Sequence, residues 1–140
     1  MNIKIAENQS DFFSCMLIRA SVFVIEQNVD ISLELDEEDK TCTHFLLLNE
    51  GNAVGTCRVL NHGDVAHLGR VAILKEARNQ GFGATMLAHV EQSCRKLGVK
   101  KIELGAQLQA LAFYEKQGYH AYGDVFLDAN IEHRMMVKEL

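Results

Sequence analysis

The arrangement of apolar and polar residues along the chain predicts seven strands and three helices. Strands are predicted where apolar residues alternate with polar ones or form short runs, in residues 1–6, 43–49, 53–60, 65–74, 100–106, 119–125 and 133–138. Helices are predicted where apolar residues recur every three or four positions, in residues 9–27, 81–97 and 109–117. Elements in this order predict an α+β fold, in which helices flank one central, twisted, mixed sheet.

Turn and capping residues mark the boundaries between these segments. Residues 50–52 (Glu-Gly-Asn) separate two predicted strands and indicate a hairpin. Ser10 is expected to cap helix 9–27. Residues 28–40 are acidic and lack a clear period, which predicts an irregular loop. Because no linker or repeat interrupts the pattern, residues 1–140 are expected to form a single domain.

Composition and charge argue against several classes of function. The net charge is −5 and the lysines and arginines are scattered, so no nucleic-acid partner is expected. No apolar run approaches the ~20 residues needed to span a bilayer, so no membrane association is expected. The first residues lack the basic segment and apolar core of a signal peptide, which predicts a cytoplasmic location.

The cysteines give no indication of a metal site. Cys15, Cys42, Cys57 and Cys94 are far apart and form no C-x-x-C pair. We interpret the proximity of Cys42 and His44 as coincidence and expect reduced thiols and no metal ligand set.

A glycine-rich turn between strand 65–74 and helix 81–97 predicts an anion site. Backbone N–H groups at the start of a helix are unpaired, and the helix dipole is positive there. Gly81 and Gly83 have no Cβ, so a phosphate can approach the backbone closely. Arg78 adds a positive charge beside them. The turn is therefore predicted to bind a pyrophosphate.

Two common phosphate motifs do not fit this turn. A P-loop requires lysine and then a hydroxyl residue after its second glycine, whereas Ala84 and Thr85 follow Gly83. A dinucleotide turn requires a third small residue, and that position holds Met86.

The pattern Arg-x-x-Gly-x-Gly at residues 78–83 instead resembles the acyl-coenzyme A loop of the GNAT superfamily of N-acyltransferases. A second string, F-Y-E-K-x-G-Y at residues 113–119, resembles another block of the same superfamily. The resemblance implies the GNAT fold and direct transfer of an acetyl group from acetyl-CoA to an amine. The acceptor is expected to be a small molecule, and the protein a monomer or homodimer.

The resemblance also implies roles for particular residues. Those expected to bind the diphosphate are Arg78, Asn79, Gln80, Gly81, Phe82, Gly83 and Ala84. Those expected to pair with the pantetheine amides are Val71, Ala72 and Ile73. Gln107 is expected either to bond the cofactor or to cap the next helix. Tyr114 matches the tyrosine near the sulfur, which would bind the cofactor and protonate the thiolate; alternatively it is a core residue.

Two further strings resemble the ElaA-like branch of the superfamily: V-F-V-x-E-Q-x-V at residues 22–29 and I-x-H-x-x-M at residues 131–136. Within them, Glu26 and His133 are the candidates for acceptor binding or proton transfer. Each could instead be an ordinary polar residue. The branch usually has proline at the position of Asp30, so the local backbone is expected to differ.

The acidic residues 34–39 and Arg70 each allow two interpretations. The acidic residues are interpreted as a solvated loop, although they could attract a cationic acceptor. Arg70 could face the acceptor or pair with an acid of that loop. The function is open as well: besides an enzyme, the chain could be a non-catalytic acyl-CoA sensor, or a nucleotide-binding protein unrelated to coenzyme A.

Overall fold

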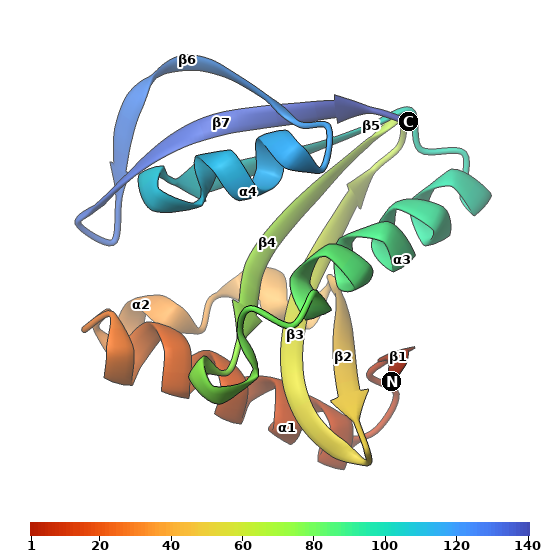
Figure 1. Cartoon of the computed structure of the whole chain (residues 1–140), viewed down its shortest axis with the longest axis vertical. Helices are drawn as coiled ribbons and strands as arrows, with labels where there is room; N and C mark the ends of the chain where they lie inside the picture. The colour runs from red at the N-terminus through yellow and green to blue at the C-terminus, as the bar shows by residue number, and fades with distance from the viewer.

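The computed structural model describes all 140 residues and contains one seven-stranded sheet in the order β1-β2-β3-β4-β5-β7-β6 (Figure 1). The strands are β1 (Asn2–Ile5), β2 (Thr43–Asn49), β3 (Asn52–His62), β4 (Val65–Ile73), β5 (Lys101–Gln107), β6 (His120–Asp128) and β7 (Ile131–Glu139). Only β4 and β5 run parallel, and all other neighbours are antiparallel. The predicted α+β class with a mixed sheet is confirmed.

The helices lie between the strands roughly where the pattern predicts them. They are α1 (Gln9–Arg19), the π-helix η1 (Ala20–Glu26), α2 (Ile31–Glu34), α3 (Phe82–Lys96) and α4 (Leu111–Lys116), with short 3₁₀ turns η2 (Glu37–Lys40), η3 (Lys75–Ala77) and η4 (Leu108–Ala110). None is both long and apolar enough to cross a membrane.

Three details of the N-terminal part differ from the prediction. The single helix predicted over residues 9–27 is α1 continued by a π-helix, a wider turn that hydrophobic spacing cannot distinguish. The cap is Asn8 rather than Ser10, because the Asn8 side chain accepts a hydrogen bond from the N–H of Asp11 at 2.8 Å. The loop predicted over residues 28–40 contains α2 and η2, each opened by an aspartate: Asp30 and Asp36.

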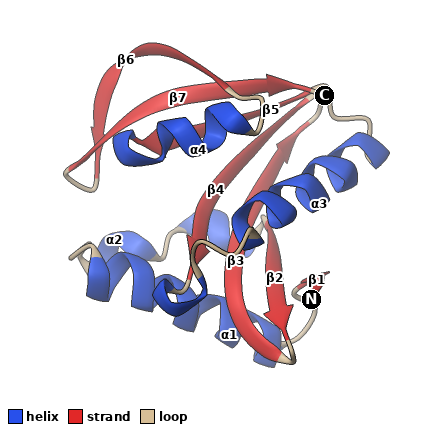
Figure 2. Ribbon diagram, viewed as in Figure 1, coloured by secondary structure: helices blue, strands red, loops and turns tan.

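Helices cover both faces of the sheet (Figure 2). On one face α3 and α4 bury a cluster of 19 residues, which includes Phe45 and Leu47 of β2. On the other face Cys15 and Ile18 of α1 pack with Leu46. Alternate side chains of β2 thus point to opposite faces, as the two-residue period of a strand requires.

The parallel pair β4 and β5 separates along its length (Figure 1). Backbone pairing begins at Val65 with Lys101 and ends at Leu68 with Leu104. Beyond that point the register of β3 against β4 shifts, and Arg70 takes a left-handed backbone with φ 51°. The carboxyl-terminal halves of β4 and β5 therefore leave backbone edges unpaired on either side of an opening, which we term the slot.

Candidate active site

The slot opens into a large cavity at the carboxyl ends of β4 and β5. Its volume is about 1280 Å³, and residues of η1, β4, α3, β5, α4, β6 and β7 line it. Small-molecule pockets usually measure ~300–1,000 Å³, so the cavity is large enough for an extended ligand and a second molecule beside it. The cavity lies outside the carboxyl ends of the parallel pair β4 and β5, which is where ligands bind in open α/β sheets.

Most of the predicted site residues line this cavity. They are Val71, Ala72, Ile73, Arg78, Asn79, Gly81, Phe82, Gly83, Ala84, Gln107, Tyr114 and His133. Glu26 and Gln80 are not part of its wall. The side chain of Gln80 instead donates to the backbone oxygen of Glu76 at 3.3 Å.

The first turn of α3 has the features of an anion site. Gly81 stands at the N-cap with φ +80°, a left-handed conformation that glycine adopts without strain. No side chain caps the helix and no acidic residue lies in its first turn. The N–H groups there are free of side-chain partners, and the helix dipole adds to their attraction for an anion.

Arg78 and Glu26 bind each other. Nη1 and Nη2 of Arg78 donate to the two carboxylate oxygens of Glu26 at 2.9 and 2.8 Å, while its Nε donates to the carbonyl oxygen of Ile73 at 3.0 Å. The predicted phosphate-binding arginine and a predicted proton acceptor thus form a bidentate ion pair at the rim of the slot.

Tyr114 is almost fully buried, with 7 % of its surface exposed, and lies at the wall of the cavity. Its ring makes edge contacts with the rings of Phe113 and Tyr119. Burial raises the pKa of the Tyr114 phenol well above its ordinary value of 10.0, so the phenol keeps its proton at neutral pH. Such a group can donate a proton but does not act as a base.

The surroundings of His133 fix its tautomer. Its Nδ1 lies 2.6 Å from the carbonyl oxygen of Ile131. A carbonyl only accepts hydrogen bonds, so Nδ1 carries the proton and neutral His133 has its lone pair on Nε2. The ring stacks on Phe126 at 5.6 Å between centroids. His133 therefore has the form that a general base needs.

Gln107 bridges to the N-terminal part of the chain. Its Nε2 donates to Oε1 of Gln27 at 2.8 Å, and its Oε1 accepts from Gln109. Gln107 stands at the N-cap of η4 but makes no capping hydrogen bond, so the capping role is not realised. Sequence reasoning assigned no role to Gln27, because no local pattern signals a partner 80 residues away.

The acidic segment is only partly solvated. Glu37 and Glu38 are exposed as expected, but the side chains of Glu34 and Asp39 are 7 % and 6 % exposed. They are buried because arginines bind them, which the spacing of the acids along the sequence does not reveal. Burial alone would raise the pKa of Asp39, but hydrogen bonds from Arg19 and Arg58 outweigh it and hold that pKa below its ordinary value of 3.8.

Three arginines bind the carboxylates of this acidic segment. Arg19 binds Glu34 and Asp39, and Arg58 binds Asp36 and Asp39. Arg70 binds Glu34 at 2.8 Å, so it does pair with an acid of the loop. It also lines the cavity, and its contact with an acceptor stays a prediction. Glu38 also lies 3.7 Å from Arg58, so four carboxylates face three guanidinium groups, and most of the negative charge that could attract a cationic acceptor is neutralised.

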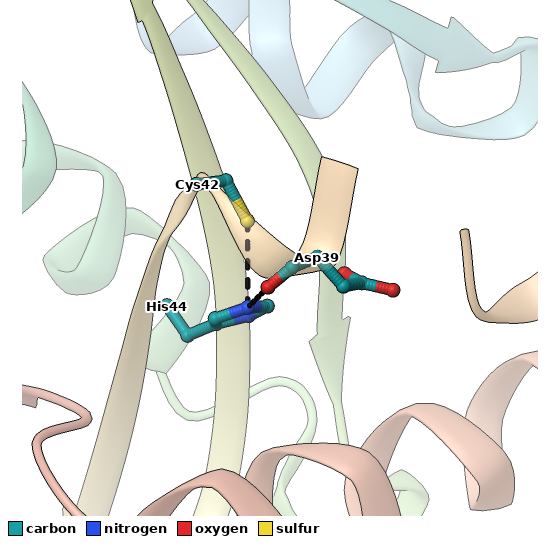
Figure 3. A group of neighbouring side chains, drawn as sticks. All are labelled: Asp39, Cys42 and His44. Carbon is teal, nitrogen blue, oxygen red and sulfur yellow. Dashed lines mark hydrogen bonds between the residues drawn. The ribbon is translucent and has the colours of Figure 1, made fainter. Parts of the chain in front are cut away.

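Asp39, Cys42 and His44 lie close enough to hold a metal ion in principle (Figure 3). The contacts argue for a structural role. Nε2 of His44 lies 3.0 Å from the backbone oxygen of Asp39 and 3.4 Å from Sγ of Cys42. The carboxylate of Asp39 points away from His44 (Figure 3) and binds Arg19 and Arg58. A metal would have to draw that carboxylate from two guanidinium groups.

The chain matches a family model described as the acetyltransferase (GNAT) domain over residues 15–140. It is 33% identical over 140 residues to "Uncharacterized N-acetyltransferase YjcF" of Bacillus subtilis, covering 99% of this chain and 100% of that protein. It is 26% identical over 137 residues to ElaA of Escherichia coli, covering 94% of this chain and 89% of ElaA.

Solved structures share the fold along the whole chain. The crystal structure of E. coli ElaA matches with a TM-score of 0.89 at 24% identity, covering 99% of this chain and all of that one. An aminoglycoside 6'-N-acetyltransferase complexed with coenzyme A matches with a TM-score of 0.78 at 16% identity, covering 99% and 97%. The chain belongs to the GNAT acetyltransferase family and is an acyltransferase with the fold of that family.

Proposed function

We propose that the protein transfers an acetyl group from acetyl-CoA directly to a primary amine of a small-molecule acceptor. One observation carries the proposal: the unpaired edges of β4 and β5 open beside the uncapped N-terminus of α3. The amide groups of a ligand can pair with these strand edges, and its phosphates can bind the N–H groups at the start of α3. The aminoglycoside enzyme complexed with coenzyme A supports the assignment, because it shares the fold along nearly the whole chain.

The donor is bound mainly by backbone groups in this proposal. The N–H groups of residues 80–84 bind the diphosphate, and the strand edge at residues 71–73 pairs with the pantetheine amides. A Cβ at Gly83 would lie 3.1 Å from Cζ of Phe113, so a side chain there would require the Phe113 ring to shift by a few tenths of an ångström. Tyr114 lines the same cavity, and in this proposal its phenol lies near the sulfur of the donor.

The reaction needs a neutral amine and a good leaving group. Nε2 of His133 takes a proton from the acceptor ammonium, and the amine then attacks the thioester carbonyl carbon to form the C–N bond. A backbone N–H of β4 near Arg70 stabilises the oxyanion that forms. The C–S bond breaks as the intermediate collapses, and Tyr114 gives its proton to the thiolate, so that free coenzyme A leaves. The amide nitrogen then loses its remaining extra proton, which restores the Tyr114 phenol, while His133 releases the first proton to solvent.

A thiol-release assay with acetyl-CoA and a panel of amines tests this function. Primary amines are expected to release coenzyme A in proportion to acetylated product, which mass spectrometry of the mixture detects. If coenzyme A binds but no amine is acetylated at any pH between about 6 and 10, the range that brackets a histidine base and a free amine, the proposal of an amine acetyltransferase fails and an acyl-CoA sensor takes its place.

A further inference from the structure

Two adjacent residues contact opposite sides of the slot. The carboxylate of Glu26 binds Arg78, which follows β4, at 2.8 and 2.9 Å. The side chain of Gln27 binds Gln107, the last residue of β5, at 2.8 Å. Glu26 and Gln27 together therefore bridge the carboxyl ends of the two strands that separate. We term these two residues the strap.

The strap stands at the end of an unusual helix. It closes η1, a π-helix of seven residues, whereas π-turns are rare and occur mostly at functional sites. Asn28 follows with a left-handed φ of 58°, and the N–H of Val29 bonds back to the oxygen of Phe23 at 2.9 Å. The chain thus reverses direction directly after the strap.

The Glu26 carboxylate binds the guanidinium group of Arg78, which is equally suited to bind a phosphate. A guanidinium presents parallel N–H donors that match a carboxylate or a phosphate equally well. Arg78 and Glu26 remain 37 % and 30 % exposed, and pairs this exposed contribute little to stability. Arg78 lies three residues before the N-cap Gly81, where the proposed diphosphate begins. An anion there can exchange with the Glu26 carboxylate.

We propose that the Glu26 carboxylate occupies the place of the diphosphate on Arg78 until coenzyme A enters, and that cofactor binding displaces it and releases the strap. The inference rests on the proposed binding of coenzyme A at the start of α3. It also assigns the Glu26 carboxylate a role in two stages. Arg78 holds it before the donor binds. It becomes free to bind the acceptor ammonium only after the donor has displaced it.

Calorimetric titration of coenzyme A into the whole protein tests the displacement. Glu26→Gln removes the competing charge, so coenzyme A should bind about two- to five-fold more tightly, the range that an exposed pair permits. Glu76→Gln is the matched control. It removes one negative charge from η3, next to the same turn, but Glu76 has no ion-pair partner. The control should change the affinity less than Glu26→Gln does.

The outcomes separate the two proposals. A wild-type protein that gives no heat with coenzyme A contradicts the proposed function and this inference with it. A wild-type protein that binds, together with a Glu26→Gln variant that binds no more tightly than Glu76→Gln, overturns the displacement alone.

A tryptophan introduced beside the strap tests the release of the strap even if Glu26→Gln does not fold. The chain has no tryptophan, and Ile25, next to the strap, is 74 % exposed. In an Ile25→Trp variant, saturating coenzyme A should change the emission and its quenching by iodide as the strap moves. An unchanged spectrum in a variant that binds coenzyme A would contradict the release of the strap.

Discussion

Gly83 in the first turn of α3 lies against the ring of Phe113 in α4, so that a Cβ at residue 83 would come 3.1 Å from Cζ of that ring. The two motif regions of the chain are thus in contact at the proposed donor site. Gly83→Val should push the turn away from α4 and weaken coenzyme A binding by about tenfold, ~1.4 kcal/mol. Calorimetry measures the loss, and adding Phe113→Leu should recover part of it. No recovery would show that the contact is not the cause.

His133→Gln should lower kcat by about 100-fold, the lower range for loss of a general base. Thermal unfolding of the variant should stay close to wild type, so that the lost rate reports on the chemical step. An unchanged rate would make His133 an ordinary polar residue of β7.

Tyr114→Phe keeps the ring and removes only the phenol oxygen. We expect kcat to fall by about 10- to 100-fold with little change in KM for acetyl-CoA, because the proton is needed only as the thiolate leaves. Burial raises the pKa of Tyr114 above its ordinary value of 10.0, so its loss should not alter the rate profile below that pH. Thioesters with a more acidic thiol should be less sensitive to the substitution, and equal sensitivity would argue against an acid role.

Asp39→Asn should destabilise the protein by about 3–5 kcal/mol, because it leaves the buried Arg19 without one of its two carboxylates. The folded-state pKa of Asp39 lies below its unfolded value. Its contribution to stability is therefore present above about pH 4 and is lost as pH falls through the folded pKa. Urea unfolding from neutral pH down to about pH 2 should show a shallower acid decline in the variant. Glu37→Gln, on an exposed side chain, is the control.

Removal of metal ions should change neither activity nor stability. The carboxylate of Asp39 is already bound by two arginines, so Asp39, Cys42 and His44 lack a free third ligand. Dialysis against EDTA followed by thermal unfolding and elemental analysis checks the expectation. One equivalent of zinc that is lost together with stability would show that the group is a metal site.

The strands and the glycine turn before α3 were predictable because their signals are local. Residues 65–74 are apolar and β-branched and the glycines follow directly, so strand, turn and helix can be inferred from one window. The side chain of Gln27 could not be placed in this way, because its partner Gln107 is brought near only by the assembled fold. The acidic segment was misjudged for the same reason, since its burial depends on Arg58 of β3 and Arg70 of β4.

Some expectations from the sequence stay predictions. The amine acceptor, the cytoplasmic location, the oligomeric state and the catalytic roles of Glu26, His133 and Tyr114 all await measurement. The structure adds a distinction between the two candidate bases. Glu26 is engaged by Arg78, whereas Nε2 of His133 is left as an acceptor.

The separation of β4 from β5 beyond Leu68 and Leu104 leaves the sheet incomplete at its centre. In a continuous sheet a neighbouring strand would form hydrogen bonds with the unpaired backbone groups. Here the acetyl donor would form them instead, so that it would act as a removable strand of the sheet. Any ligand that binds only the native state raises the free energy of unfolding by RT ln(1 + [L]/Kd). The abundance of this polypeptide would then follow the supply of its own substrate, with no separate sensor.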